Sequence, residues 1–325
     1  TRLGLDSVDA VFLLFTAVVW LVSSAFAWTW IRAARTRFFT LCLLTMAGNF
    51  GALVALDVPF FYTSVALMSF AAYGLIAHSF TREAKHAANV YIVLVVIGEA
   101  TLAGALILAA GATGAIEFAS VQAGLASIPA RDLVIALAFV GFGIKAGVLF
   151  LHVWLPLAHP VAPAPASAVL SGTIIVTGLV GWMRFLPVGV IALPGWGGLL
   201  VALGFAAAFY GVAIGIDQRN PKVVLAYSSI SQMGIMTVGI GMMLLEPGLA
   251  NTLRTSIAFL ALHHGLCKSA LFLGAGLARA GIDMSRRRAL IVGLAIPSLA
   301  LAGAPLTSGM IAKSALAVSS ATVAD

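Results

Sequence analysis

Charged residues are scarce in this chain, and their scarcity excludes a water-soluble domain. Of the 325 residues only 9% are charged and 62% are hydrophobic, and the mean hydropathy is +1.10. Soluble domains carry about 25% charged and 45–50% apolar residues. The composition therefore predicts a protein that is embedded in a membrane.

Cysteine and cofactor-binding motifs are equally scarce. The two cysteines, Cys42 and Cys267, lie in separate apolar runs, so they form neither a disulfide framework nor a CxxC metal or iron–sulfur site. No GxGxxG or phosphate-loop pattern follows a strand, and the short connections leave no room for a soluble nucleotide-binding or redox domain. We expect no cofactor, no metal site and no nucleic-acid partner.

Long apolar runs, by contrast, fill the sequence. A helix needs about 20 apolar residues to cross a bilayer, whereas the strands of a membrane β-barrel alternate polar and apolar residues over about ten positions. The runs do not alternate, and they predict an all-α polytopic bundle of about ten transmembrane helices in a single domain, 1–325. The expected spans are 9–31, 38–56, 58–78, 89–110, 132–154, 164–185, 195–216, 222–245, 254–277 and 289–320.

Basic residues are distributed unevenly between the two sets of connections. If the first span runs inward, eleven of them lie in inner connections: Arg32, Arg35, Arg37, Arg82, Lys85, Arg219, Lys222, Arg279, Arg286, Arg287 and Arg288. Four lie in outer ones: Arg2, Arg131, Arg184 and Arg254. Because cytoplasmic loops are enriched in Lys and Arg, this count predicts the orientation of a multi-pass protein in the inner (cytoplasmic) membrane.

Four ionisable residues fall inside predicted spans, where each costs at least about 2.5–3.5 kcal/mol and normally faces the bundle interior. They are Glu99, Lys145, Lys268 and Lys313. Two histidines extend the set: His152 follows Lys145 by two helical turns, and His264 precedes Lys268 by four residues on the same helix face. A cationic pair that is so close can hold and release a proton.

Simpler interpretations of some of these residues stay open. Lys313 is a snorkelling anchor if the last helix is short. His152, His159 and His263 are each compatible with a hydrogen-bonded packing role.

Two predicted spans are interrupted by residues that weaken helices. The fifth ends in a run with four prolines, Pro156, Pro160, Pro163 and Pro165, and the tenth is broken at Pro305 within GAPLTSG. Irregular backbone at membrane depth survives only against protein or a watery cavity, and paired interruptions are typical of ion paths in transporters. Each interrupted span also carries a lysine. The eighth span adds a polar strip beside Lys222, formed by Ser228, Ser229, Ser231 and Gln232.

Four motifs, in order, resemble the antiporter-like membrane subunits of respiratory complex I, Mrp antiporters, hydrogenase-4 and formate hydrogenlyase. KAGVLFLHVWLPLAHPVAPAPASAVLSG resembles the family's lysine-bearing broken helix, and NPKVVLAYSSISQMG the lysine-plus-AYSS helix. HHGLCKSALFLGAG is similar to its His-x3-Lys helix, and GAPLTSGMIAK to its second broken helix. The AHPVAPAPASAVLSG variant is most similar to the hydrogenase-4 component B type.

The resemblance implies about fourteen helices with two inverted five-helix repeats, of which this chain would hold the third to the twelfth helix. The first repeat would be 38–185, and the second, 195–320, would lack its last helix. The chain opens at Thr1, so we expect either a naturally short protein or a fragment.

Some family residues are missing. Ala66 stands where the family has a glutamate that partners the broken-helix lysine, and Ser171 and Val176 occupy the positions of a relay base. Glu99, one span along, is the expected replacement carboxylate for Lys145.

We therefore expect a proton- or cation/proton-translocating subunit of a respiratory or hydrogenase-type complex, with other membrane subunits as partners and no catalytic centre of its own. Its expected proton path is Lys145, Glu99, His152, Lys222, His264, Lys268 and Lys313. The alternatives are an assembly subunit that has lost pumping, which Ala66, Ser171 and Val176 favour, and a coupling subunit for uptake of an inorganic ion.

Overall fold

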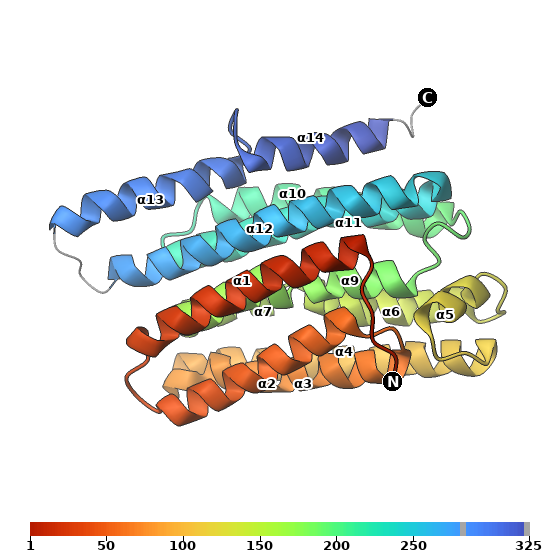
Figure 1. Ribbon diagram of the computed structural model, residues 1–325, viewed down its shortest axis with the longest axis horizontal. Helices are drawn as coiled ribbons and strands as arrows, with labels where there is room; N and C mark the ends of the chain where they lie inside the picture. Colours follow the sequence, from red (N-terminus) through yellow and green to blue (C-terminus); the bar gives the residue numbers. More distant parts are fainter. Residues whose placement is uncertain (280–283, 322–325) are drawn as a thin grey trace.

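The computed structural model describes residues 1–279 and 284–321, and their backbone is a bundle of roughly parallel helices (Figure 1). Within these residues the only β-type contacts are two isolated bridges, Leu3 with Ala55 and Asp57 with Glu117. The helices are α1 (Ser7–Trp30), α2 (Arg35–Val54), α3 (Val58–Ile76), α4 (Arg82–Thr113), α5 (Phe118–Leu125), α6 (Arg131–Ala146), α7 (Trp154–Val161), α8 (Ala164–Val169), α9 (Val176–Phe185), α10 (Pro194–Gly215), α11 (Pro221–Leu245), α12 (Ala250–Arg279), α13 (Met284–Ala302) and α14 (Ser308–Ala321).

Four helix starts follow local sequence rules. Asp6, Asp57, Thr81 and Asn220 each accept a hydrogen bond from a backbone N–H of the first turn of α1, α3, α4 and α11. Such caps satisfy donors that have no partner within the helix. The polar residues between apolar runs therefore mark where the spans begin.

In the described residues, eight helices or continuous helical segments are long and apolar enough to cross a membrane. They coincide with eight of the ten predicted spans. Of the other two, 132–154 is helical only as far as Ala146, the end of α6, with α7 beginning at its last residue, and 289–320 is divided into α13 and α14. The all-α membrane fold is thus confirmed, while the last predicted span consists of two shorter helices separated at 303–307, around Pro305.

The first interruption lies earlier than the proline run predicted. Helix α6 ends at Ala146, the chain is irregular over 147–153, and α7 then includes Pro156 and Pro160. Gly147 takes a left-handed φ of +65°, and an added Cβ would lie 2.4 Å from Leu155 Cδ1. Glycine tolerates this conformation without a steric penalty, so it ends the helix before any proline is reached.

The central segment of the bundle runs through α8, a π-helical turn (Leu170–Ile174) and α9, and every residue from Ala164 to Phe185 is buried. It packs on α1, α6, α11 and α12. A π-turn widens the helix by one residue and is frequent at functional sites. Here it brings Ser171 to face both α11 and α12.

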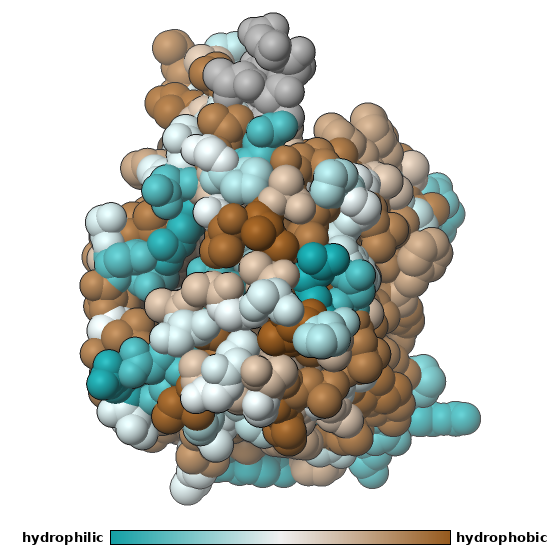
Figure 2. Space-filling model, turned by 90° about the vertical axis from the view of Figure 1, so that its right-hand side faces the viewer, coloured by the Kyte–Doolittle hydropathy of each residue, from teal (hydrophilic) through white to brown (hydrophobic). Residues whose placement is uncertain are grey.

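A buried ion cluster joins the helix ends at the side of the bundle that carries α5. Arg184, in the last turn of α9, pairs with Asp9 of α1 at 3.0 Å, and Arg254 of α12 bonds the other oxygen of Asp9 at 3.3 Å. Arg184 also donates to the carbonyls of Ala52, Leu53 and Ala55, which end α2. Arg184 therefore lies in a buried helix turn, and its assignment to an outer connection was wrong. Figure 2 views this end, where hydrophilic patches lie between apolar side chains.

Candidate functional site

Lys145 occupies the last turn of α6, immediately before the interruption. It lies in the middle of the predicted fifth span, and it is only 7% exposed. The carbonyl of the preceding Ile144 accepts from the backbone N–H of Gly147 at 3.4 Å and from the indole of Trp154 at 2.9 Å. The broken helix therefore holds the lysine at a fixed, buried helix terminus.

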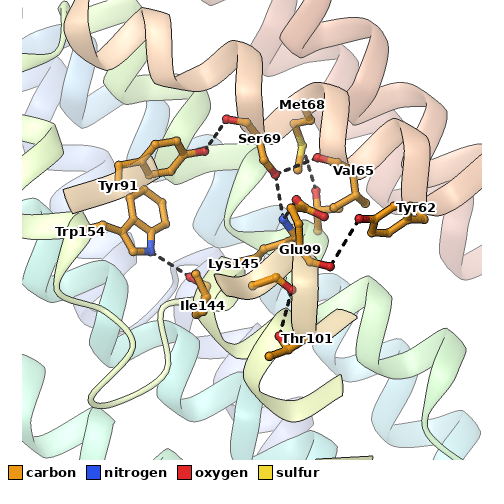
Figure 3. A network of polar contacts seen from close by, with 12 residues as sticks. Tyr62, Val65, Met68, Ser69, Tyr91, Glu99, Thr101, Ile144, Lys145 and Trp154 are labelled. Atoms are coloured by element: carbon orange, nitrogen blue, oxygen red, sulfur yellow. Dashed lines mark hydrogen bonds and ion pairs between the residues drawn. The ribbon is translucent and has the colours of Figure 1, made fainter. Parts of the chain in front are cut away.

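The ammonium of Lys145 has two side-chain partners, drawn in Figure 3. Its Nζ lies 2.6 Å from Glu99 Oε1, and it donates to Ser69 Oγ at 2.8 Å. Glu99 belongs to α4 and Ser69 to α3, so three helices meet at this charge. The predicted pairing of Lys145 with Glu99 is confirmed as a contact. Ser69 was missed, because one serine among many in an apolar helix gives no signal.

The surroundings of the pair are aromatic and nearly closed. Tyr91 donates to the carbonyl of Ser69 at 3.1 Å and packs edge-on against Trp154 (Figure 3). A cavity of about 10 Å³, lined by Ser69, Tyr91, Lys145 and Trp154 among others, adjoins the ammonium. This is about the smallest space that holds one water molecule. The second carboxylate oxygen of Glu99 is buried and has no hydrogen-bond partner in the described chain.

The seven-residue spacing predicted that His152 shares a helix face with Lys145, but it does not. It lies in the irregular stretch after α6, so helical periodicity does not apply across the two residues. Its ring is 7% exposed and packs against Tyr210 of α10 at 5.1 Å between centroids. The prediction was wrong because Gly147 ends the helix.

A second polar cluster forms around α12. His264 and Lys268 are both fully buried and face the bundle interior, as their four-residue spacing predicted. Lys268 donates to the carbonyl of Leu225 in α11 at 2.7 Å, and His264 Nε2 lies 3.3 Å from the carbonyl of Ser171. Ser229 Oγ of α11 donates to the same Leu225 carbonyl and lies 2.7 Å from Ser171 Oγ.

Lys222 lies at the start of α11 and reaches the junction between α7 and α8. Its Nζ donates to the carbonyl of Ala162 at 2.7 Å and to Ser167 Oγ at 3.4 Å. The side chain is 4% exposed. Lys222 was counted as an inner-loop residue, but its side chain is buried and donates a hydrogen bond to the carbonyl of Ala162, the residue that caps α7.

Lys313 lies in α14, after the second interruption, and donates to the carbonyl of Leu301 in α13 at 2.9 Å. It borders a cavity of about 430 Å³ that also exposes Ser228, Ser231 and Gln232, most of the predicted polar strip. His263 contacts this region through Ser308, the first residue of α14, at 2.9 Å. The half-buried lysine therefore borders an open cavity that is lined mainly by apolar side chains and carries a few polar residues of α11.

The three buried lysines and the half-buried Lys313 differ in their partners. Lys145 has a carboxylate, whereas no carboxylate in the described residues pairs with Lys222, Lys268 or Lys313. Each of these three donates to a backbone carbonyl instead. The described residues also contain no group of three His, Cys, Asp or Glu side chains placed to hold a metal ion.

Comparison with known proteins agrees with this arrangement. Residues 55–324 match the family described as NADH:quinone oxidoreductase/Mrp antiporter, transmembrane. The chain belongs to this family.

Relatives of this antiporter-like chain include hydrogenase-4 component B of Escherichia coli strain K12, 30% identical over 84% of the chain and 43% of the relative. Formate hydrogenlyase subunit 3 of the same organism is 29% identical over 84% of the chain and 45% of the relative. The chain therefore spans less than half the length of these relatives.

Solved structures share the fold. The Mrp complex from Dietzia sp. DQ12-45-1b contains a chain with a TM-score of 0.86 and 25% identity, covering 98% of this chain and 61% of that one. A chain of the archaeal membrane-bound sulfane sulfur reductase gives the same TM-score at 24% identity, with 98% and 67% coverage. The resemblance seen in the four sequence motifs is confirmed.

Proposed function

We propose that this chain is part of a proton-translocating membrane subunit in a multi-subunit respiratory or hydrogenase-type complex of the inner membrane. The observation that carries the proposal is the buried ion pair of Lys145 and Glu99 at an interrupted helix. An ionisable pair is costly at membrane depth and is normally retained for ion movement. The relatives named above are subunits of such complexes by their names, which supports the same assignment.

The geometry suggests how the pair acts. At about 4 Å and an effective dielectric near 20, opposite charges attract by roughly 4 kcal/mol, so separating Glu99 from Lys145 strongly favours release of a proton from the ammonium. Helix α6 ends beside Lys145 and the following backbone is irregular, so a small shift of the break changes the Nζ–Oε1 distance. Ser69 then keeps a hydrogen bond to the neutral amine.

The remaining residues extend the path towards the second interrupted helix. Lys222, His264, Lys268 and Lys313 are the proposed carriers, together with His152 at the break. The lysines among them donate to carbonyls, which accept a hydrogen bond from an ammonium and, more weakly, from a neutral amine. Loss of a proton therefore leaves their hydrogen bonds in place.

The test uses the full-length protein in vesicles of its native membrane, energised through the complex that co-purifies with it. Lys145→Ala is expected to abolish proton uptake, measured with a pH-sensitive dye, while assembly stays intact. Lys145→Arg is also expected to fail, since guanidinium keeps its proton at accessible pH. Glu99→Gln should impair uptake nearly as severely.

Lys85→Ala, which changes an exposed lysine of α4, serves as the matched control and should pump normally. Wild-type pumping by both Lys145→Ala and Glu99→Gln would contradict the proposal. That outcome would favour the assembly-subunit alternative, which the missing family residues at Ala66, Ser171 and Val176 support.

A further inference from the structure

His159 is a buried imidazole whose polar atoms have no use in the packing. It lies in α7, is 0% exposed, and stacks on Phe272 of α12 with ring centroids 4.4 Å apart at 28°. Neither ring nitrogen has a hydrogen-bond partner in the described chain. It is one of the histidines for which the sequence left a plain packing role open.

A packing role does not explain an imidazole at this position. A buried polar group without a partner costs about 1–3 kcal/mol, and a neutral imidazole carries one donor and one acceptor. A phenylalanine would stack on Phe272 without that cost. The ring nitrogens are therefore the feature that needs an explanation.

Two lysines of neighbouring helices lie within electrostatic range of the His159 ring. The ring interacts electrostatically with Lys222 of α11 and Lys268 of α12. Ser167 joins the first contact, because its hydroxyl donates to the His159 carbonyl at 3.2 Å and accepts from Lys222 Nζ at 3.4 Å. On α12, Lys268 lies one turn before Phe272, so Phe272, the ring on which His159 stacks, shares a helix face with Lys268.

The balance of charge in this region favours sharing protons. Lys222 also interacts electrostatically with the positive charge of Arg279 at the end of α12. No carboxylate in the described residues forms an ion pair with Lys222 or Lys268. Each added positive charge in a poorly solvated region raises the cost of the next. Protonating all three groups at once is therefore costly.

We propose that His159 is the proton relay between Lys222 and Lys268. A proton leaves Lys222 Nζ, which becomes a neutral amine, and binds a free ring nitrogen of His159. The imidazolium then passes a proton to neutral Lys268 Nζ, and the net result is the transfer of one proton from α11 to α12. The proposal rests on the proposed function, and it supplies from α7 the relay base that is missing at Ser171 and Val176.

Two variants test the relay in the same native vesicles. His159→Phe keeps the aromatic stack on Phe272 and removes both nitrogens, and His159→Gln keeps a polar group that does not bind a proton near neutral pH. Both are expected to assemble within twofold of wild type and to lower proton uptake per electron transferred at least tenfold. His78→Gln is the control, since His78 also has a buried unpartnered nitrogen but lies near Phe38, in another part of the bundle.

The ratio of protons to electrons separates a relay from a structural role, because a damaged complex loses both together. Wild-type ratios in His159→Phe and His159→Gln, with pumping lost in Lys145→Ala, would overturn the relay and leave the proposed function standing. Wild-type ratios in all three would overturn both. Failure of both His159 variants to assemble would also overturn the relay, because it would show that the imidazole is a packing residue.

Discussion

Among single residues, the lysines inside the bundle differ in the group that accepts their hydrogen bond. Lys145 is held by a carboxylate 2.6 Å away, so the charge that faces its ammonium belongs to a side chain of another helix. Lys268 and Lys313 donate to the backbone carbonyls of Leu225 and Leu301, which do not titrate. In the proposed function, this difference assigns the switching role to Lys145 and the carrier role to Lys268 and Lys313.

The pair of Lys145 and Glu99 also predicts a stability pattern. Removing one member of a buried pair leaves an unpaired charge and typically costs about 3–5 kcal/mol, whereas replacing both is often neutral. Lys145→Met alone should lower the thermal midpoint of the purified protein in detergent by about 5–10 °C. Adding Glu99→Gln should restore most of that loss without restoring pumping.

The cycle has a clear negative outcome. A double variant that melts no higher than Lys145→Met would show that the two charges do not stabilise each other. Arg131→Gln, which breaks an exposed pair with Asp132, is the matched control and should shift the midpoint little.

At the scale of helices, the sequence predicts boundaries better than it predicts interruptions. Apolar length located eight continuous spans, because a bilayer imposes a minimum length that composition reveals directly. The first break was predicted at Pro156 and beyond, but it begins at Gly147, where Leu155 packs so closely that an added Cβ would lie 2.4 Å from it. Residues after the break therefore lie elsewhere than predicted: His152 is in the irregular stretch and not on the helix of Lys145.

Tertiary contacts that no local pattern encodes account for the rest. Glu99 was found because it is a lone carboxylate in an apolar run, a signal that a bilayer makes strong. Ser69 and Arg184 were missed, because a serine is common in membrane helices and an arginine near a span end looks like an anchor. The π-turn at Leu170–Ile174 was not predicted from the sequence.

The close approach of α12 to the π-turn gives a prediction at this scale. An added Cβ at Gly265 would lie 2.7 Å from the carbonyl oxygen of Gly172 and 2.9 Å from the ring of Phe15. Gly265→Ala should therefore separate the two helices, loosen the contact of His264 with Ser171, and cost about 1–3 kcal/mol by overpacking.

The control for this variant is Gly198→Ala on α10, where nothing lies within 4 Å of the added atom. It should be neutral or stabilising by up to about 1 kcal/mol, because alanine favours a helix over glycine. Both are measured as thermal midpoints in detergent. Equal midpoints for the two variants would show that α12 and the π-turn are not in tight contact.

Across the whole molecule, the two ends of the bundle are chemically different. The starts of α2, α4 and α11 lie at one end, where Arg35, Arg82 and Arg219 are exposed (Figure 1). The opposite end carries α5 and ties its basic residues Arg184 and Arg254 to Asp9. Free positive charge is therefore concentrated at the first end, although the side chains of Arg286 and Arg287 lie outside the described residues.

This asymmetry predicts the orientation in the membrane. Because free Lys and Arg are retained on the cytoplasmic side, Arg35, Arg82 and Arg219 should face the cytoplasm, and Asp132 at the start of α6 should face the other side. In a background with Cys42 and Cys267 replaced by alanine, single cysteines at these four positions are treated with a membrane-impermeant maleimide. The three arginine positions should react only after the membrane is permeabilised, and the Asp132 position in intact cells. Labelling of Arg35→Cys, Arg82→Cys and Arg219→Cys in intact cells would show that the orientation is the reverse of the predicted one. It would then place the Lys222 end of the proposed relay on the outer side.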